Sequence, residues 1–193
     1  MNGLFSAARE IQDLCDEQGW RFCFIGGLAV LRWGEPRQTR DVDLTLLTGF
    51  GGEEPFVDRL LERFAPRVPD AKGFALKNRV LLLRSDDGVG LDVALGAMTF
   101  EEHAVDRATG WRIDQSLVLQ TCSAHDLVVY KVFAGRPQDW IDVEMIIARR
   151  SRELDMDLVQ QELVPLLELK GAEEDWGRLQ GLLGTPPGLP NIP

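Results

Sequence analysis

The chain has 193 residues, of which 45% are hydrophobic, and its formal net charge is −10. This length and composition are sufficient for a folded core in one domain, or in one domain with a small appendage. No apolar run approaches the roughly 20 residues of a membrane span, and the acidic N-terminus is unlike a signal peptide, so a soluble cytoplasmic protein is expected. The acidic balance argues against a protein that wraps nucleic acid over a broad surface, because such surfaces are basic.

The three cysteines, Cys15, Cys23 and Cys122, are scattered along the chain. Their spacing matches neither a zinc site nor a disulfide framework. They are therefore expected to be ordinary buried thiols.

The first third of the chain alternates between helical and extended patterns. Apolar residues at helical spacing predict amphipathic helices over residues 4–18 and 54–64. Apolar runs predict strands over 20–25 and 41–47, with a short helix over 28–33 between them.

The next segment is predicted to be mainly extended. Apolar runs over 74–84 and 89–95 are joined by a turn that contains Asp-Gly, a strong signal for a β-hairpin. The span from Thr99 to Glu102 has the pattern of a capping box that opens a short helix. One or two short strands are expected over 111–119.

From Ser123 onward the pattern is helical. Helices are predicted over 124–134, 138–150 and 156–169, the last of them disturbed at Pro165. A final short helix is expected over 173–182. The predicted layout is an α/β domain over 1–122, a helical region over 123–183 and a Pro/Gly-rich tail over 184–193 that is expected to be disordered.

The most informative stretch is FIGGLAVLRWGEPRQTRDVDLTLL at residues 24–47. It indicates a strand, a turn at Gly26-Gly27, a helix, a loop and a second strand that carries Asp41 and Asp43. Residues i and i+2 of a strand point to the same side, and paired carboxylates repel unless a cation lies between them. Asp92 lies in a second apolar run and is the candidate third carboxylate.

This set of residues suits a particular chemistry. Mg²⁺ favours oxygen ligands, and clustered carboxylates can hold Mg²⁺ ions that clamp an attacking oxygen and a phosphate. The glycines ahead of the short helix would leave backbone N–H groups for phosphate. The alternative is that the three aspartates are solvated carboxylates, or salt-bridge partners of nearby arginines. Metal with phosphate indicates phosphoryl or nucleotidyl transfer.

The segment GGLAVLRWGEPRQTRDVDL resembles the signature of the polymerase-β-like nucleotidyltransferase superfamily. Its Gly-Gly turn and Arg-x-Thr-x-Asp-x-Asp ending look most like the AbiEii/MenT-type nucleotidyltransferase toxins. KVFAGRPQDWIDVEMI at 131–146 is similar to a downstream helix pair of that group. The resemblance implies an α+β fold, with a mixed sheet flanked by helices and followed by a small helical region.

The resemblance also implies roles for individual residues. Asp41, Asp43 and Asp92 would ligate Mg²⁺ and carry catalysis together with Lys131, which would reach the triphosphate or the nucleotide. The implied nucleotide-binding residues are Gly26, Gly27, Lys131, Arg136 and Asp139.

Several of these residues have alternative interpretations. Arg37 and Arg40 suit phosphate binding, because arginine presents a fork of donors, but they equally suit neutralisation of the acidic residues. Lys131 and Arg136 could be ordinary solvated helix charges, and Asp139 could simply cap its helix. Asp142 is either a second acidic residue of the pocket or a salt-bridge partner of Arg136, and the salt bridge is favoured.

The sequence therefore predicts an NTP-dependent enzyme that transfers a nucleotide to an acceptor hydroxyl. By resemblance, the acceptor could be a tRNA 3′ end and the partner an antitoxin protein. The first alternative is a small-molecule nucleotidyltransferase of the aminoglycoside-modifying kind, which an acidic pocket would favour. The second is a non-catalytic nucleotide-binding regulatory protein. The oligomeric state is not indicated.

Overall fold

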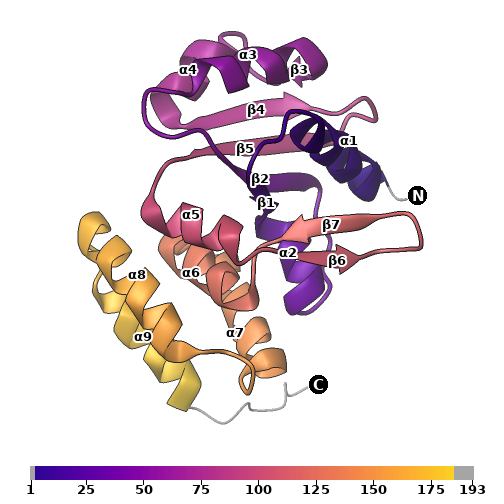
Figure 1. The fold of residues 1–193 in the computed structure, drawn as a ribbon. Helices are drawn as coiled ribbons and strands as arrows, with labels where there is room; N and C mark the ends of the chain where they lie inside the picture. Colours follow the sequence, from indigo (N-terminus) through magenta and orange to yellow (C-terminus); the bar gives the residue numbers. More distant parts are fainter. Residues whose placement is uncertain (1–2, 185–193) are drawn as a thin grey trace. The chain divides into compact units, whose positions relative to one another are not determined.

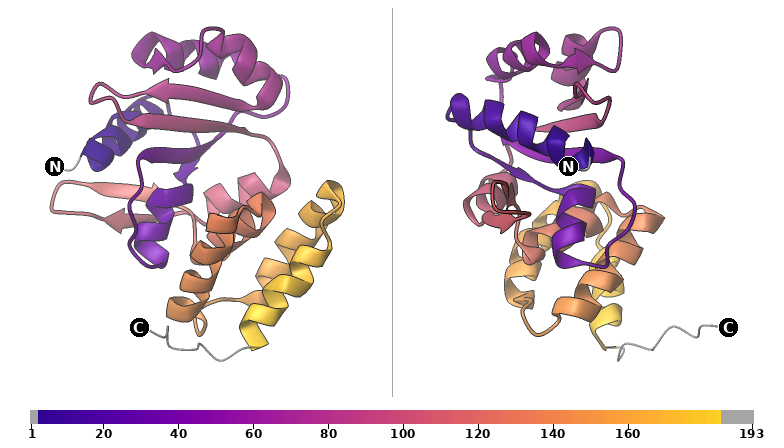
Figure 2. Two further views of the ribbon diagram at one scale, coloured as in Figure 1. Left: turned by 180° about the vertical axis from the view of Figure 1, so that it is seen from behind. Right: turned by 90° about the vertical axis from the view of Figure 1, so that its right-hand side faces the viewer.

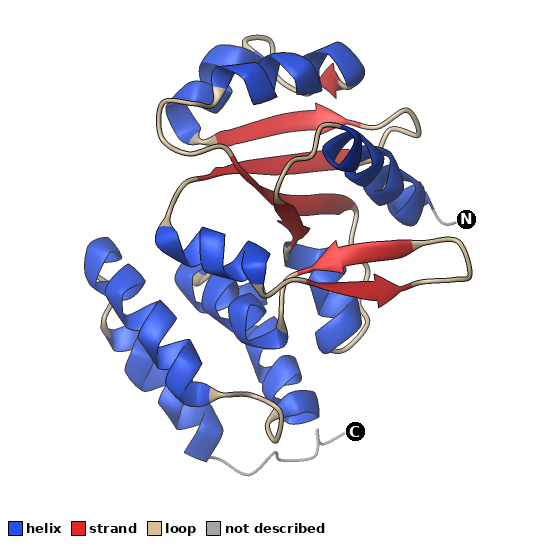
Figure 3. Ribbon diagram, in the orientation of Figure 1, coloured by secondary structure: helices blue, strands red, loops and turns tan. Residues whose placement is uncertain are grey.

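The computed structural model describes residues 3–184. These residues divide into two compact units. The first contains residues 3–29 and 37–123, and the second contains residues 30–36 and 124–184. In Figure 3, all strands belong to the first unit, and the second unit is helical.

The first unit begins with helix α1 and contains every strand that the structure describes. Helix α2 starts in this unit and ends in the second unit. The elements in chain order are α1 (Gly3–Glu17), β1 (Phe22–Phe24), α2 (Gly26–Trp33), β2 (Asp41–Leu47), α3 (Glu54–Arg63), β3 (Ala65–Pro66), α4 (Ala71–Asn78), β4 (Val80–Arg84), β5 (Gly90–Gly96), α5 (Thr99–Asp106), β6 (Thr109–Arg112) and β7 (Val118–Thr121).

The described strands form one mixed sheet in the order β3-β4-β5-β2-β1-β7-β6. The pairs β2/β5 and β1/β7 are parallel, and the other neighbouring strands are antiparallel. Helix α1 packs against β2 and β7, and α4 packs against β4 (Figures 1 and 2). The expected fold class, a mixed sheet flanked by helices, is confirmed.

The two faces of the central strands differ sharply in burial. On one face, alternate apolar side chains are at most 2% exposed, as the period of two in a strand requires. The opposite face carries Asp41, Asp43 and Asp92, which are exposed or half-buried. The buried alternate residues are Val42, Leu44, Leu46, Leu91, Val93 and Leu95. Burial of this apolar face therefore fixes the direction in which the acidic side chains point.

The second unit contains the last part of α2 and a set of C-terminal helices. Helix α6 packs against both α7 and α8, and α8 packs against α9. The helices are α6 (Ala124–Ala134), α7 (Pro137–Arg150), α8 (Met156–Lys170) and α9 (Glu174–Gly184). Residues 185–193 of the expected tail lie outside the described residues.

One predicted strand is too long. Residues 71–78 form helix α4, and β4 begins only at Val80. The Asp70 carboxylate accepts a hydrogen bond from Gly73 N and so caps the helix. Arg79 then ends the helix in the left-handed conformation, with φ 55°. The apolar run concealed this boundary because its residues suit both a helix and a strand.

Two smaller expectations are also corrected. The side chain that caps α5 belongs to Glu101, not Glu102: it accepts hydrogen bonds from the backbone N–H groups of Ala97 and Met98 at 2.8 and 2.9 Å. Helix α8 continues through Pro165 to Lys170 and ends at Gly171 in the left-handed region.

The three cysteines are buried thiols, as expected. Burial, followed by the charge of Asp16, raises the pKa of the Cys15 thiol to about 12, so the thiol is protonated at neutral pH. No helix among residues 3–184 has both the length and the apolar composition needed to cross a membrane.

Candidate active site

Three carboxylates lie on the open face of the sheet, on two neighbouring strands. In the parallel pairing of β2 with β5, Asp43 is directly opposite Asp92, and Asp41 is opposite Gly90. The Asp41 side chain is 52% exposed and that of Asp92 is 33% exposed. Strand register therefore brings Asp92 beside Asp43. The sequence alone could not show where Asp92 lies relative to Asp41 and Asp43.

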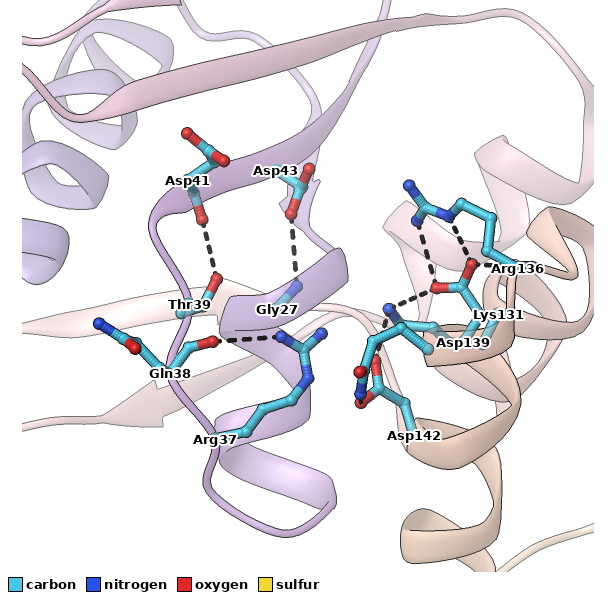
Figure 4. Close-up of polar contacts among 11 residues, drawn as sticks. Gly27, Arg37, Gln38, Thr39, Asp41, Asp43, Lys131, Arg136, Asp139 and Asp142 are labelled. Carbon is cyan, nitrogen blue, oxygen red and sulfur yellow. Dashed lines mark hydrogen bonds and ion pairs between the residues drawn. The ribbon is translucent and has the colours of Figure 1, made fainter.

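The Gly-Gly turn lies against the Asp43 carboxylate. Gly27 N donates a hydrogen bond to Asp43 Oδ2 at 3.3 Å, at the start of helix α2 (Figure 4). Gly26 has φ +55°, and a Cβ at this position would overlap the Asp43 carboxylate. A Cβ at Gly27 would overlap the Thr39 hydroxyl, which in turn donates to the Asp41 carbonyl at 3.3 Å. The glycines therefore allow the turn to approach the acidic strand closely.

Gly26→Ala is expected to destabilise the protein more than Gly49→Ala. Both residues have positive φ, at +55° and +72°, so both substitutions cost about 1–2 kcal/mol of backbone strain. Only at Gly26 does the new Cβ also meet a side chain, since nothing lies within 4 Å at Gly49. Urea unfolding of both variants measures the difference, and equal losses would show that Asp43 does not crowd the turn.

Arg67 lies against these carboxylates, and it was not among the residues predicted from the sequence. It follows β3, and its backbone N–H donates to Leu82 O at 2.9 Å. Its guanidinium forms an ion pair with Asp92 Oδ1, and its Nη1 atom lies 3.8 Å from Asp41 Oδ1. No motif marks this arginine. Only the pairing of the two-residue strand β3 with β4 brings it to the carboxylates.

Gly90 makes room for this arrangement. A Cβ at this position would overlap Asp41 Oδ1 and would lie 2.8 Å from Arg67 Nη1. The small residue opposite Asp41 thus leaves room for the carboxylate and the guanidinium. We name Asp41, Asp43 and Asp92 the acidic cluster.

The donor set of the acidic cluster fits a hard divalent cation, because carboxylate oxygens are the ligands that Mg²⁺ prefers. As they stand, residues 3–184 contain no group of three or more His, Cys, Asp or Glu side chains arranged to hold a metal. At this site Arg67 contacts oxygens of Asp41 and Asp92. The positive charge beside Asp41 and Asp92 is that of the Arg67 guanidinium.

The two arginines of the preceding loop lie close in sequence but make different contacts. Arg37 Nη1 donates to Gln38 O at 3.3 Å (Figure 4). Arg40 is exposed. In the structure, the arginine that pairs with the acidic cluster is Arg67.

The second unit contains a buried ionic cluster of its own. Lys131 Nζ lies 2.9 Å from Asp139 Oδ1 and 2.9 Å from Asp142 Oδ2, and all three side chains are at most 6% exposed (Figure 4). Lys131 therefore links α6 to α7. Asp142 also accepts a hydrogen bond from Gln138 Nε2 at 3.2 Å. Its pairing with Lys131 was not among the partners expected for it.

Asp139 is the centre of this cluster. It accepts hydrogen bonds from the backbone N and the Nε of Arg136 at the start of α7, so it caps the helix as well as binding Lys131. Burial favours the protonated acid, but the hydrogen bonds from Arg136 and Lys131 outweigh it and lower the pKa of Asp139. The Arg136 side chain is 73% exposed, so it covers the buried carboxylate from the solvent side.

The lowered pKa of Asp139 predicts a loss of stability in acid. A carboxyl whose folded pKa is depressed contributes stability above its unfolded pKa of about 3.9, and the contribution disappears as the pH falls through the folded pKa. Asp139→Asn should therefore flatten the rise of unfolding free energy with pH between about pH 2 and 5. Asp16→Asn is the control of opposite sign, because partial burial and Asp13 raise the pKa of Asp16. An unchanged slope in Asp139→Asn would contradict the assignment.

The family model described as "Nucleotidyltransferase of unknown function (DUF6036)" matches residues 2–175. The chain belongs to this family. Membership agrees with the resemblance of residues 24–47 to the polymerase-β-like nucleotidyltransferases at the level of the superfamily. No curated protein matches the chain.

Solved structures share the fold of this family member at low sequence identity. Antibiotic-resistance factor ANT(2'')-Ia matches with a TM-score of 0.56 and 15% identity, over 90% of this chain and 96% of that one. An antigenic nucleotidyltransferase-like protein from Paracoccidioides brasiliensis matches with a TM-score of 0.49 and 16% identity, over 92% of this chain and 90% of that one. The lincosamide antibiotic adenylyltransferase LnuA, bound to lincomycin, matches with a TM-score of 0.49 and 14% identity, over 73% of this chain and 94% of that one. The match to antibiotic-resistance factor ANT(2'')-Ia shows that the two chains share a fold.

Proposed function

We propose that this nucleotidyltransferase family member transfers a nucleoside monophosphate from an NTP to an acceptor hydroxyl, with Mg²⁺ as its cofactor. The observation that carries the proposal is the pairing of Asp43 with Asp92 on adjacent parallel strands, with Asp41 on the same face. Three carboxylates kept together on an open face are costly unless cations join them. A non-catalytic nucleotide-binding protein would have no need of three mutually repelling carboxylates.

In this proposal Asp41, Asp43 and Asp92 hold the metal. When bound, the metal polarises the phosphate and neutralises its charge. The acceptor oxygen forms a bond to the α-phosphorus while the bond from that phosphorus to the bridging oxygen breaks, and pyrophosphate leaves. Asp92 is proposed to take the hydroxyl proton, because a carboxylate within hydrogen-bond reach of an acceptor hydroxyl can act as a general base. Catalysis is then mostly positioning and electrostatic stabilisation.

The nucleotide-binding residues are proposed on the same basis. Gly26 and Gly27 would bring the start of α2 to the phosphates, because helix N-termini favour anions. In the first unit, Arg37 and Arg40 would supply guanidinium groups with solvent access. In the second unit, Lys131, Arg136 and Asp139 are proposed as nucleotide-binding residues by resemblance alone. Arginine forks bind phosphate oxygens in pairs.

The first candidate acceptor is a tRNA 3′ end, and the partner would then be an antitoxin protein. This follows from the likeness of GGLAVLRWGEPRQTRDVDL to the AbiEii/MenT-type toxins. The net charge of −10 means that RNA would have to be bound through a local basic surface.

The second candidate acceptor is a cationic small molecule. It is favoured by the fold shared with antibiotic-resistance factor ANT(2'')-Ia and by the net charge of −10, because an acidic surface attracts cations. Expression in the host distinguishes the two candidates: a toxin slows growth, whereas a modifying enzyme confers resistance to the drug.

The direct test is incubation of the purified protein with Mg²⁺ and each α-labelled NTP in turn. One series contains total tRNA and the other contains a panel of aminoglycosides, and Asp43→Ala is the control. Label that moves to one acceptor, and is lost in the control, supports the proposal and identifies both substrates. Labelled product that forms equally with Asp43→Ala would refute it.

A further inference from the structure

Arg67 and a divalent metal would compete for the same oxygen atoms. The Arg67 guanidinium contacts Oδ1 of both Asp41 and Asp92, on neighbouring strands. A metal held by Oδ1 of Asp92 would displace Arg67 from that atom. One guanidinium carries a single positive charge against three carboxylates, whereas a divalent cation compensates more of their charge.

The contacts of Arg67 leave its own donors incompletely satisfied. Its Nε atom is buried and has no hydrogen-bond partner among the described residues. A buried N–H without an acceptor costs free energy. The ion pairs therefore hold the side chain in a position where its Nε–H lacks an acceptor, and release of the side chain into water would remove this cost.

The way Arg67 is anchored allows the side chain to leave. Its position in the chain is fixed by the hydrogen bond from its backbone N–H to Leu82 O, which does not involve the guanidinium. The side chain is 22% exposed, so it already reaches solvent. Movement of the guanidinium alone would uncover Asp41 and Asp92.

Arg79 shows how a structural arginine differs in the same unit. Its guanidinium donates to Glu53, Gly49 O and Leu95 O and lies over the Phe50 ring. It contacts backbone carbonyls as well as a carboxylate, and none of these groups belongs to the acidic cluster. Arg79 is thus a matched control with the same charge and a different role.

We propose that Arg67 is an exchangeable internal counter-ion, which neutralises Asp41 and Asp92 in the metal-free protein and leaves them when a divalent cation binds. This inference rests on the proposed metal-dependent function and adds a regulatory residue to it. The apparent metal affinity is then reduced by the fraction of molecules in which Arg67 still covers the carboxylates. Metal binding is made conditional on release of this side chain.

The test is direct Mn²⁺ binding, measured by the electron paramagnetic resonance signal of free Mn²⁺ without nucleotide. Arg67→Gln is expected to bind Mn²⁺ about tenfold more tightly than the wild type, while Arg79→Gln binds like the wild type. Mn²⁺ should also raise the Tm of Arg67→Gln more than that of the wild type, because the uncovered carboxylates repel without it. Should Arg67→Gln fail to fold, Arg67→Lys keeps the charge but loses the fork of donors, and it should still bind Mn²⁺ more tightly.

Equal or weaker Mn²⁺ binding by a folded Arg67 variant would overturn the inference. If the wild type nevertheless transfers nucleotide, the proposed function stands and only the role of Arg67 is wrong. If neither the wild type nor Arg67→Gln binds Mn²⁺ and no transfer occurs, the metal-dependent function fails as well. The two failures are thereby distinguished.

Discussion

Asp43→Asn should lower the rate of nucleotidyl transfer by at least about 10²–10³-fold, the loss typical of removing one group that stabilises the transition state. Asp43 lies on β2 between Asp41 and the paired Asp92 on β5, so it is the central carboxylate of the set. The substitution removes one negative charge and one oxygen ligand with almost no change in volume. Steady-state kinetics with the NTP and acceptor identified by the labelling assay measure the loss.

The same variant should remain folded. An asparagine oxygen can still accept the hydrogen bond that Gly27 N donates to Asp43 Oδ2, and one fewer carboxylate reduces repulsion within the acidic cluster. Asp87→Asn, in the exposed hairpin turn, is the matched control and should keep full activity. A stable Asp43→Asn variant with wild-type kinetics would contradict the assignment of the site.

Lys131→Met is expected to lower the free energy of unfolding by about 3–5 kcal/mol, the cost typical of removing one partner from a buried ion pair. The substitution keeps the length and packing of the aliphatic stem but removes the ammonium group that lies 2.9 Å from both Asp139 Oδ1 and Asp142 Oδ2. Both carboxylates are at most 2% exposed, so water cannot replace the ammonium group. Chemical denaturation at neutral pH measures the effect.

Lys72 is a closely matched control for Lys131. Its ammonium group also joins two carboxylates, with Nζ 3.1 Å from Glu54 and 2.7 Å from Asp58, but its side chain is 38% exposed. Lys72→Met should therefore change stability little, because exposed pairs are screened by water and salt. The double variant Lys131→Met/Asp142→Asn should recover part of the loss of Lys131→Met. No recovery would show that the lost stability comes from packing, not from charge.

Much of the local structure could be predicted from the sequence. The Gly-Gly turn, the strand at 41–47 and the run of C-terminal helices each have a pattern contained within a few neighbouring residues, and local spacing is enough to identify them. The same is true of Asp41 and Asp43, because residues i and i+2 of a strand always share a face. Residues 74–78 were misassigned because an apolar run fits a helix as well as a strand.

The sequence by itself determined the β2 carboxylates and the glycine turn in front of them. It also determined that Lys131, Arg136 and Asp139 lie in the C-terminal helical region. Only the tertiary structure decided that Asp92 lies opposite Asp43 and that Arg67 covers Asp41 and Asp92. These contacts join residues 25 or more positions apart. They are set by strand register and by the packing of a buried sheet face, which are properties of the whole sheet and not of any local pattern.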